Sequence, residues 1–161
     1  MAEQGHRLYG TQTFHASTTV DAPLKYVYDW CTDYRSDDWK LSSRRPRLRY
    51  HPIRVSPRRV VRVRIVPTGA PDPIIAVDVV RLHPPSGWHT DQIDEDDRMS
   101  ADYRLTRLGR SKTRVDLLIT ERWVVRQHPT RAEMAKRATA TWDRFARQIE
   151  ERFRRGLPAK G

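Results

Sequence analysis

Cysteine is almost absent from this sequence of 161 residues. The single cysteine, Cys31, cannot form an internal disulfide, and no cysteine–histidine cluster has the spacing of zinc ligands. We therefore expect no metal and no cofactor. Cys31 falls in a predicted helix, where a lone cysteine is usually a small buried hydrophobe, and a reactive thiol is the alternative.

Long apolar runs are also missing. No segment approaches the roughly 20 apolar residues that cross a bilayer, and residues 1–10 lack the apolar run of a signal peptide. The sequence therefore predicts a soluble, cytoplasmic protein. Its length suits a single domain over residues 1–161, with flexible tails at 1–10 and 156–161.

Acidic residues are missing from one long segment. Between Asp38 and Asp72 the sequence contains ten basic residues and no acid, in a chain whose net charge is +11. Acids gather instead between Asp91 and Asp102. This separation of charge predicts an electrostatically polarised molecule.

What the sequence does contain is regular alternation of apolar and polar residues. Residues 11–20 alternate in this way, which predicts a strand. An Asp-Ala-Pro sequence at 21–23 then predicts the start of a helix, and an apolar stripe follows at helical spacing. A second short helix or turn is expected around 33–39.

The alternation continues through six further segments that are separated by turn sequences. These predicted strands are 47–55, 58–66, 74–82, 88–93, 99–108 and 113–125. Their short connections indicate an antiparallel meander, because parallel strands need long crossovers.

The last predicted element is a long amphipathic helix from about 130 to 155. Thr130 and Glu133 form the T-x-x-E pattern of a capping box. Apolar residues then recur at steps of three or four up to Phe153. A stripe of this length predicts that the helix lies across a sheet.

This order of elements resembles the Bet v 1-like (START, SRPBCC) superfamily. The resemblance rests on HASTTVDAPLKYVYDWCTDY at 15–34, YRLTRLGRSKTRVDLLITERW at 103–123 and RAEMAKRATATWDRFARQIEERF at 131–153. It implies an α+β helix-grip fold, in which a curved seven-stranded antiparallel sheet surrounds a long C-terminal helix and two short helices follow the first strand. Members of the superfamily include lipid carriers, hormone receptors and polyketide cyclases, so the resemblance implies a fold and leaves the activity to the site.

In that fold the concave face of the sheet and the inner face of the long helix enclose a cavity. Alternation and apolar content predict its lining as Trp30, Tyr34, Trp88, Tyr103, Leu117, Ile119, Trp123, Met134, Ala138, Trp142, Phe145 and Ile149. An aromatic, apolar lining is typical of a small-molecule pocket. The alternative is that these side chains are core and fill the space.

Glu121 shares this predicted inward face with apolar neighbours on the last strand. A buried carboxylate is costly unless it is paired, so Glu121 is a candidate general acid or base. The alternatives are a solvated position near the strand end and a pair with an arginine such as Arg81.

The arginine-rich strands predict a second surface. The alternation of apolar and basic residues along these strands predicts an outward face that contains Arg47, Arg49, Arg62 and Arg64. Such a face suits RNA, the ribosome or another anionic partner. The alternative is a solvated edge whose charge discourages aggregation.

Three functions are thus open at the level of sequence. The first is a binding or carrier protein for an apolar or amphipathic small molecule, with or without a polyketide cyclase-like reaction. The second is a basic module that binds RNA or an anionic partner through the Arg44–Arg64 face. The third is a cyclase or dehydratase that uses Glu121, with Tyr103 as a further candidate residue.

Overall fold

A seven-stranded antiparallel sheet forms most of the molecule. The computed structural model describes residues 9–35, 49–66, 73–94, 97–124 and 129–160. The sheet order is β1-β7-β6-β5-β4-β3-β2, so β1 pairs with β7 while all other neighbours are consecutive in the chain. The strands are β1 (Tyr9–Val20), β2 (Arg49–Ser56), β3 (Arg59–Val66), β4 (Ile74–His83), β5 (Gly87–Ile93), β6 (Arg98–Gly109) and β7 (Lys112–Val124). The predicted meander is confirmed.

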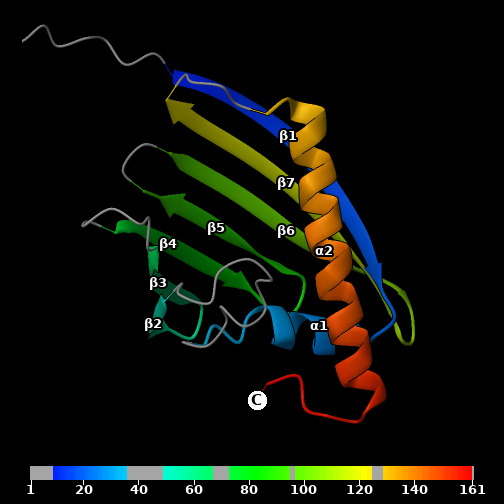
Figure 1. Cartoon of the computed structure of the whole chain (residues 1–161). Coiled ribbons are helices and arrows are strands. Elements are labelled where there is room, and N and C mark those ends of the chain that lie inside the picture. Colours follow the sequence, from blue (N-terminus) through cyan, green and yellow to red (C-terminus); the bar gives the residue numbers. More distant parts are fainter. Residues whose placement is uncertain (1–8, 36–48, 67–72, 95–96, 125–128, 161) are drawn as a thin grey trace, which may run out of the picture.

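Within the described residues, two helices accompany the sheet. Figure 1 shows α2 (Arg131–Arg154) crossing the sheet, with α1 (Leu24–Cys31) at one end of it. The predicted capping box is present: the Thr130 side chain accepts a hydrogen bond from the Glu133 N–H at 3.3 Å, and the Glu133 carboxylate accepts one from the Thr130 N–H at 2.7 Å. The second short helix predicted at 33–39 falls mostly outside the described residues, and residues 33–35 are not helical.

Contacts between α2 and β1 hold the helix against the sheet. The Thr18 hydroxyl donates to the Asp143 carboxylate at 2.6 Å, and the Asp21 N–H donates to Glu150 at 2.9 Å. Beyond α2, the Tyr26 hydroxyl donates to the Leu157 carbonyl at 2.8 Å. The core between these elements contains Phe14, Val20, Val80, Leu105, Leu117 and Ile149, all of which are buried.

The register of the strands decides which residues share the concave face. One row of directly paired residues crosses the sheet from β3 to β7 and consists of Arg62, Asp78, Gln92, Met99 and Glu121. Side chains two positions apart on a strand point to the same side. The row therefore lies on the same face as the apolar core.

The predicted outward orientation of two arginines is wrong. The Arg62 and Arg64 side chains are only 19% and 17% exposed, because they turn toward the buried Asp78. Val61, Val63 and Ile65 occupy the opposite face of β3. The alternation along β3 correctly separated its residues into two faces. The error lay in taking the more apolar face to be the buried one. Of the other two predicted arginines, Arg49 is exposed and Arg47 lies outside the described residues.

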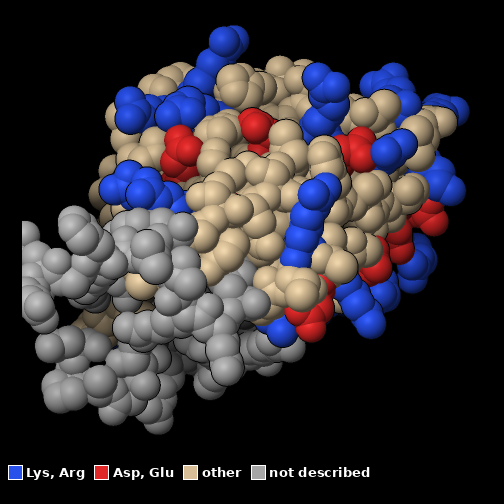
Figure 2. All heavy atoms as spheres, turned by 90° about the horizontal axis from the view of Figure 1, so that it is seen from above, with Lys and Arg blue, Asp and Glu red and all other residues tan. Residues whose placement is uncertain are grey.

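Surface charge on the visible face is mixed. Figure 2 shows basic side chains spread across that face with acidic side chains between them, without a continuous basic patch. Both helices of the described ranges are too short or too polar to cross a bilayer. With Arg62 and Arg64 turned inward, the arginine face predicted for RNA loses two of its four members.

Candidate functional site

A cavity of about 220 Å³ lies between the concave face of β3–β6 and the two helices. Its lining comes from α1 and the residues after it, from the strands and from α2. The lining residues are Trp30, Cys31, Tyr34, Tyr50, Arg62, Asp78, Trp88, Thr90, Gln92, Met99, Tyr103, Trp142 and Phe145. Aromatic and apolar side chains with a few convergent polar groups are the usual composition of a ligand pocket.

Four aromatic side chains, Trp88, Tyr103, Trp142 and Phe145, form what we call the aromatic wall. Trp88 and Tyr103 are direct partners on β5 and β6, and their rings stack with centroids 4.5 Å apart and planes 12° apart. Trp142 contacts Tyr103 at 5.6 Å and Phe145 at 5.6 Å between centroids. Such geometries stabilise the wall and present flat ring surfaces to a bound molecule.

Arg62 and Asp78 line the polar end of the cavity, and together with Arg64 on the same strand as Arg62 they form what we call the arginine cluster. Asp78 is 1% exposed. Nε and Nη2 of Arg62 both lie 2.8 Å from its Oδ2 atom, and Nε of Arg64 lies 3.2 Å from the same oxygen. Burial alone would lower the pKa of Arg62, but the Asp78 carboxylate raises it more, so the net shift is upward and the guanidinium stays charged.

Tyrosine rings hold the Arg62 guanidinium in place. Its central carbon lies 4.7 Å from the Tyr50 ring centroid and 5.3 Å from that of Tyr34, within the range of cation–π contacts. Tyr34 has a φ of 42°, a left-handed conformation that is uncommon for a bulky residue. Strain of this kind is found mostly at ligand and active sites. The turn after α1 thus places the Tyr34 side chain in the cavity at a conformational cost.

Burial keeps two tyrosine hydroxyls and one thiol of the cavity protonated. Burial raises the pKa of Tyr103 to about 12 and raises that of Tyr34 further. Burial likewise raises the pKa of the Cys31 thiol. Both tyrosines are therefore hydrogen-bond donors at neutral pH. Cys31 is an unreactive thiol there, which favours the first of its two interpretations.

The structure brings together half of the predicted ligand-binding residues. Six of the twelve line the cavity: Trp30, Tyr34, Trp88, Tyr103, Trp142 and Phe145. Leu117, Ile119 and Ile149 are buried core residues, and Ala138 packs against that core. Sequence reasoning missed Asp78 as a site residue. A lone acid in the apolar strand IIAVDVV was the signal that could have revealed it.

Glu121 lines a different pocket from the aromatic wall. It points toward the concave face as predicted and is half-buried, in a pocket of about 310 Å³ that also contains Trp123, Met134 and Arg137. Gln92 and Met99 line both pockets and so lie between them. The general acid or base role of Glu121 stays a prediction, and it requires a reacting atom in this second pocket.

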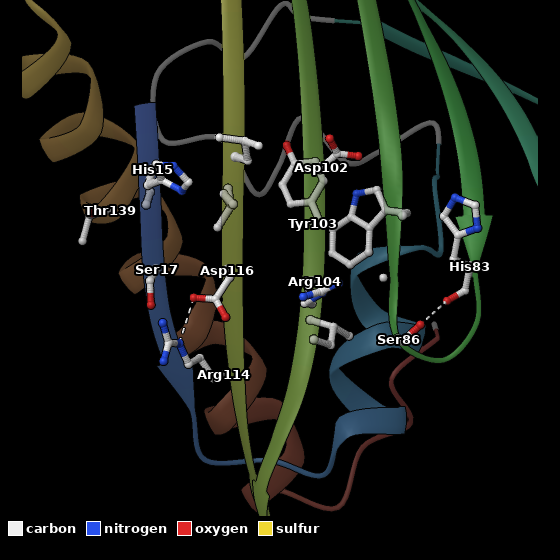
Figure 3. A pocket seen from close by; sticks show the side chains of 16 residues that line it. His15, Ser17, His83, Ser86, Asp102, Tyr103, Arg104, Arg114, Asp116 and Thr139 are labelled. Atoms are coloured by element: carbon white, nitrogen blue, oxygen red, sulfur yellow. Dashed lines mark hydrogen bonds and ion pairs between the residues drawn. The ribbon is translucent and has the colours of Figure 1, made fainter. Parts of the chain in front are cut away.

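Another hollow, of about 860 Å³, lies elsewhere on the sheet and is more open. Figure 3 shows charged and polar side chains from β1, β7, β6 and the β4–β5 connection around it, including Arg114 paired with Asp116 at 2.8 Å. Asp102, Arg104 and Asp116 alternate in sequence with the core residues of β6 and β7. Exposed ion pairs of this kind contribute little to stability and do not define an enclosed site.

His89 is held between two carboxylates beside this hollow. Its Nδ1 atom lies 2.7 Å from Asp102 and its Nε2 atom lies 3.0 Å from Asp91, while the Ser100 hydroxyl is 3.4 Å from Nε2. Asp91 is thus bonded to Nε2, the nitrogen that would have to accept the Ser100 proton if Ser100 were a nucleophile. Burial alone would lower the pKa of His89, but its bonds to Asp102 and Asp91 raise it more, so the net shift is upward. The arrangement binds a proton and is not a nucleophilic triad.

Replacing His89 by glutamine should reduce stability only at low pH. Because the pKa of His89 is higher in the folded than in the unfolded protein, protonation of His89 stabilises the fold. This contribution is complete below the pKa of the unfolded state, about 6.5, and it is lost as the pH rises through the pKa of the folded state. The difference in melting temperature between wild type and His89→Gln should therefore be larger at pH 5.5 than at pH 8.5. Ser100→Ala is the control and should track wild type. An equal difference at both pH values would contradict the upward shift.

Within the described ranges, no group of three or more His, Cys, Asp or Glu side chains is arranged to hold a metal ion. Neither a protein-family model nor a curated protein matches the chain. Solved structures do match the chain over most of its length.

Three of these structures illustrate the likeness. The Zhui aromatase/cyclase from Streptomyces sp. R1128 has 16% identity and a TM-score of 0.64, over 89% of this chain and 96% of that one. A START superfamily protein from Mycobacterium smegmatis has 14% identity and a TM-score of 0.60, over 89% and 97%. Norcoclaurine synthase from Thalictrum flavum, in complex with dopamine and hydroxybenzaldehyde, has 10% identity and a TM-score of 0.58, over 89% and 86%. At these identities the likeness concerns the fold, and the chain has the helix-grip fold of Bet v 1-like, START-type proteins.

Proposed function

We propose that the protein binds a small aromatic molecule in the cavity between the concave face and the helices. The observation that supports this most directly is the aromatic wall, whose stacked Trp88 and Tyr103 rings adjoin a space of about 220 Å³. This volume is below the range of drug-sized pockets. It suits a compact, flat molecule that stacks on the rings.

The polar end of the cavity gives the ligand an orientation. Arg62 and the protonated hydroxyls of Tyr34 and Tyr103 offer hydrogen-bond donors, while the remaining lining is mostly apolar. The preferred ligand is therefore amphipathic, with a ring at the aromatic wall and an oxygen acceptor at the donors. The norcoclaurine synthase structure of the same fold holds two aromatic molecules, which supports this class of ligand. A cytoplasmic location stays a prediction.

A neutral aromatic ketone tests the proposal. We expect 2-acetonaphthone to bind the wild-type protein in isothermal titration calorimetry, and Phe145→Ala to weaken binding about tenfold because one ring of the wall is lost. Phe153→Ala is the matched control. It lies two turns further along α2 and packs on Tyr26 with ring centroids 5.0 Å apart, away from the cavity.

The same proposal has a test that assumes no ligand. Native mass spectrometry of freshly purified protein, before and after denaturation, should reveal a released small molecule if the site is occupied in the cell. Absence of any released molecule, together with absence of 2-acetonaphthone binding at millimolar concentration, would overturn the binding function.

A cyclase-like enzyme is the second candidate, and the donor set favours it. Donors aimed at a ketone oxygen stabilise the negative charge that develops when the adjacent carbon loses a proton. A protein with this activity should accelerate exchange of the 2-acetonaphthone methyl protons in D2O, followed by NMR. Tyr34→Phe should lower that rate about tenfold or more while the affinity changes little. Without acceleration, the carrier function remains.

The same exchange assay tests Glu121. Glu121→Gln should abolish exchange if the methyl group of the bound ketone reaches the second pocket and Glu121 is the base there, and it should leave affinity nearly unchanged because the aromatic wall lies in the first cavity. Unchanged exchange would remove that role.

A further inference from the structure

The first cavity, of about 220 Å³, and the second pocket, of about 310 Å³, follow one another along the same two strands. On the β5 side, Trp88 and Gln92 line the first cavity, while Gln92 and Asp94 line the second pocket. On the β6 side, Tyr103 and Met99 line the first cavity, and Met99 also lines the second pocket. The first cavity thus ends, and the second pocket begins, at the same level on both strands.

The helix that faces these strands has the same order of residues. Met134 and Arg137, near the start of α2, line the second pocket, and Trp142 and Phe145 line the first cavity. The two pairs are eight residues apart in the chain, which corresponds to about 12 Å along a helix. The two pockets are therefore consecutive sections of one elongated space between the sheet and α2.

A pair of side chains forms the boundary between the two sections. Gln92 and Met99 are direct partners on β5 and β6, and each of them lines both pockets. The Cβ atoms of direct cross-strand partners are about 5 Å apart, so the two side chains lie next to each other on one face of the sheet. Together they form a ridge across the concave face, which we call the partition.

Packing holds the Met99 half of the partition in place. Met99 packs against the hydrophobic core, and its direct partners on the two neighbouring strands are Gln92 and Glu121. A methionine side chain is unbranched and flexible, but this one must leave its core contacts in order to turn away. Moving it out of the path of a ligand therefore costs buried apolar surface.

We propose that Met99 is a specificity-determining residue, which limits the length of the ligand by separating the first cavity from the second pocket. This inference rests on the proposed binding function and specifies the ligand class as compact aromatic molecules of the size of naphthalene. A longer ring system that stacks on the aromatic wall meets the Met99 side chain before it reaches the second pocket. Truncation of that side chain joins the two spaces and admits the longer molecule.

Two ketones of different length test the partition. 6-Phenyl-2-acetonaphthone carries one ring more than 2-acetonaphthone, at the end opposite to the ketone. In isothermal titration calorimetry, the wild-type protein should bind the longer ketone at least about tenfold more weakly than the shorter one. Met99→Ala should bind the longer ketone at least about tenfold more tightly than wild type does, because the extra ring enters the second pocket.

Met134→Ala is the matched control. Like Met99, Met134 is half-buried and packs against the core, but of the two pockets it lines only the second. The substitution removes the same atoms and enlarges the second pocket without opening the partition, so the longer ketone should bind as weakly as it does to wild type. An equal gain of affinity in both variants would show that the partition does not set the limit, and the proposal would be wrong.

Gln92→Ala opens the partition from β5 and keeps the proposal testable if Met99→Ala does not fold. It should likewise strengthen binding of the longer ketone. Equal binding of the two ketones to wild type, or no gain in either partition variant while 2-acetonaphthone binds wild type, would overturn the length limit and leave the aromatic-binding function standing. Failure of both ketones to bind any of these proteins, with no small molecule released in native mass spectrometry, would overturn the binding function as well.

Discussion

Asp78→Asn should lower the free energy of unfolding by about 3–5 kcal/mol, the cost of removing one partner from a buried ion pair. The carboxylate is 1% exposed and contacts two arginines, so the amide would remove the anion that both buried guanidinium groups contact. Urea denaturation followed by circular dichroism measures the change, read as a shift of the midpoint at constant slope.

The control for this prediction is another ion pair of equal length. Arg114 and Asp116 are also 2.8 Å apart, but their side chains are 52% and 34% exposed. Asp116→Asn should therefore cost less than about 1 kcal/mol. Equal costs for the two substitutions would show that burial of the arginine cluster does not govern its contribution.

Gly87→Ala should destabilise the protein by about 3 kcal/mol or more, through steric conflict with the backbone. A Cβ atom at Gly87 would lie 2.0 Å from the Tyr103 carbonyl oxygen, and the residue has a φ of 158°. Because Gly87 begins β5 directly before Trp88, the β5–β6 pairing that stacks Trp88 on Tyr103 would have to separate. Binding of 2-acetonaphthone should weaken together with stability.

Gly109→Ala is the matched substitution. A Cβ atom there meets only the Lys112 Cβ, at 3.8 Å, which is an ordinary van der Waals contact. It should be neutral or stabilise slightly, since alanine restricts the unfolded chain. Thermal unfolding of the two variants provides the measurement, and comparable melting temperatures would contradict the steric explanation for Gly87.

The two functions proposed above place different demands on the same cavity. The aromatic wall contributes stacking surface, whereas the donors of Arg62, Tyr34 and Tyr103 determine what is done to an oxygen placed against them. Binding uses both features in the ground state. Catalysis requires that the donors bind the transition state more strongly than the ground state.

Local pattern was sufficient for the secondary structure. The capping box at Thr130 and Glu133 and the apolar stripe predicted α2 to within a residue or so, because both signals lie within the helix itself. The strands followed from alternation with a period of two, and their short connections dictated the antiparallel order. The stack of Trp88 on Tyr103 agrees with the inward orientation predicted for both.

Tertiary structure decided the polar half of the site. Whether Arg62 points inward depends on its pairing with Asp78, sixteen residues away, which local alternation does not encode. The division of the concave space at Gln92 and Met99 likewise depends on the order of β4, β5 and β6 across the sheet. The sequence by itself thus determined the elements, their order and the alternation of faces. Only the tertiary structure decided which face of β3 is buried, because the burial of a charge depends on whether a distant partner compensates it.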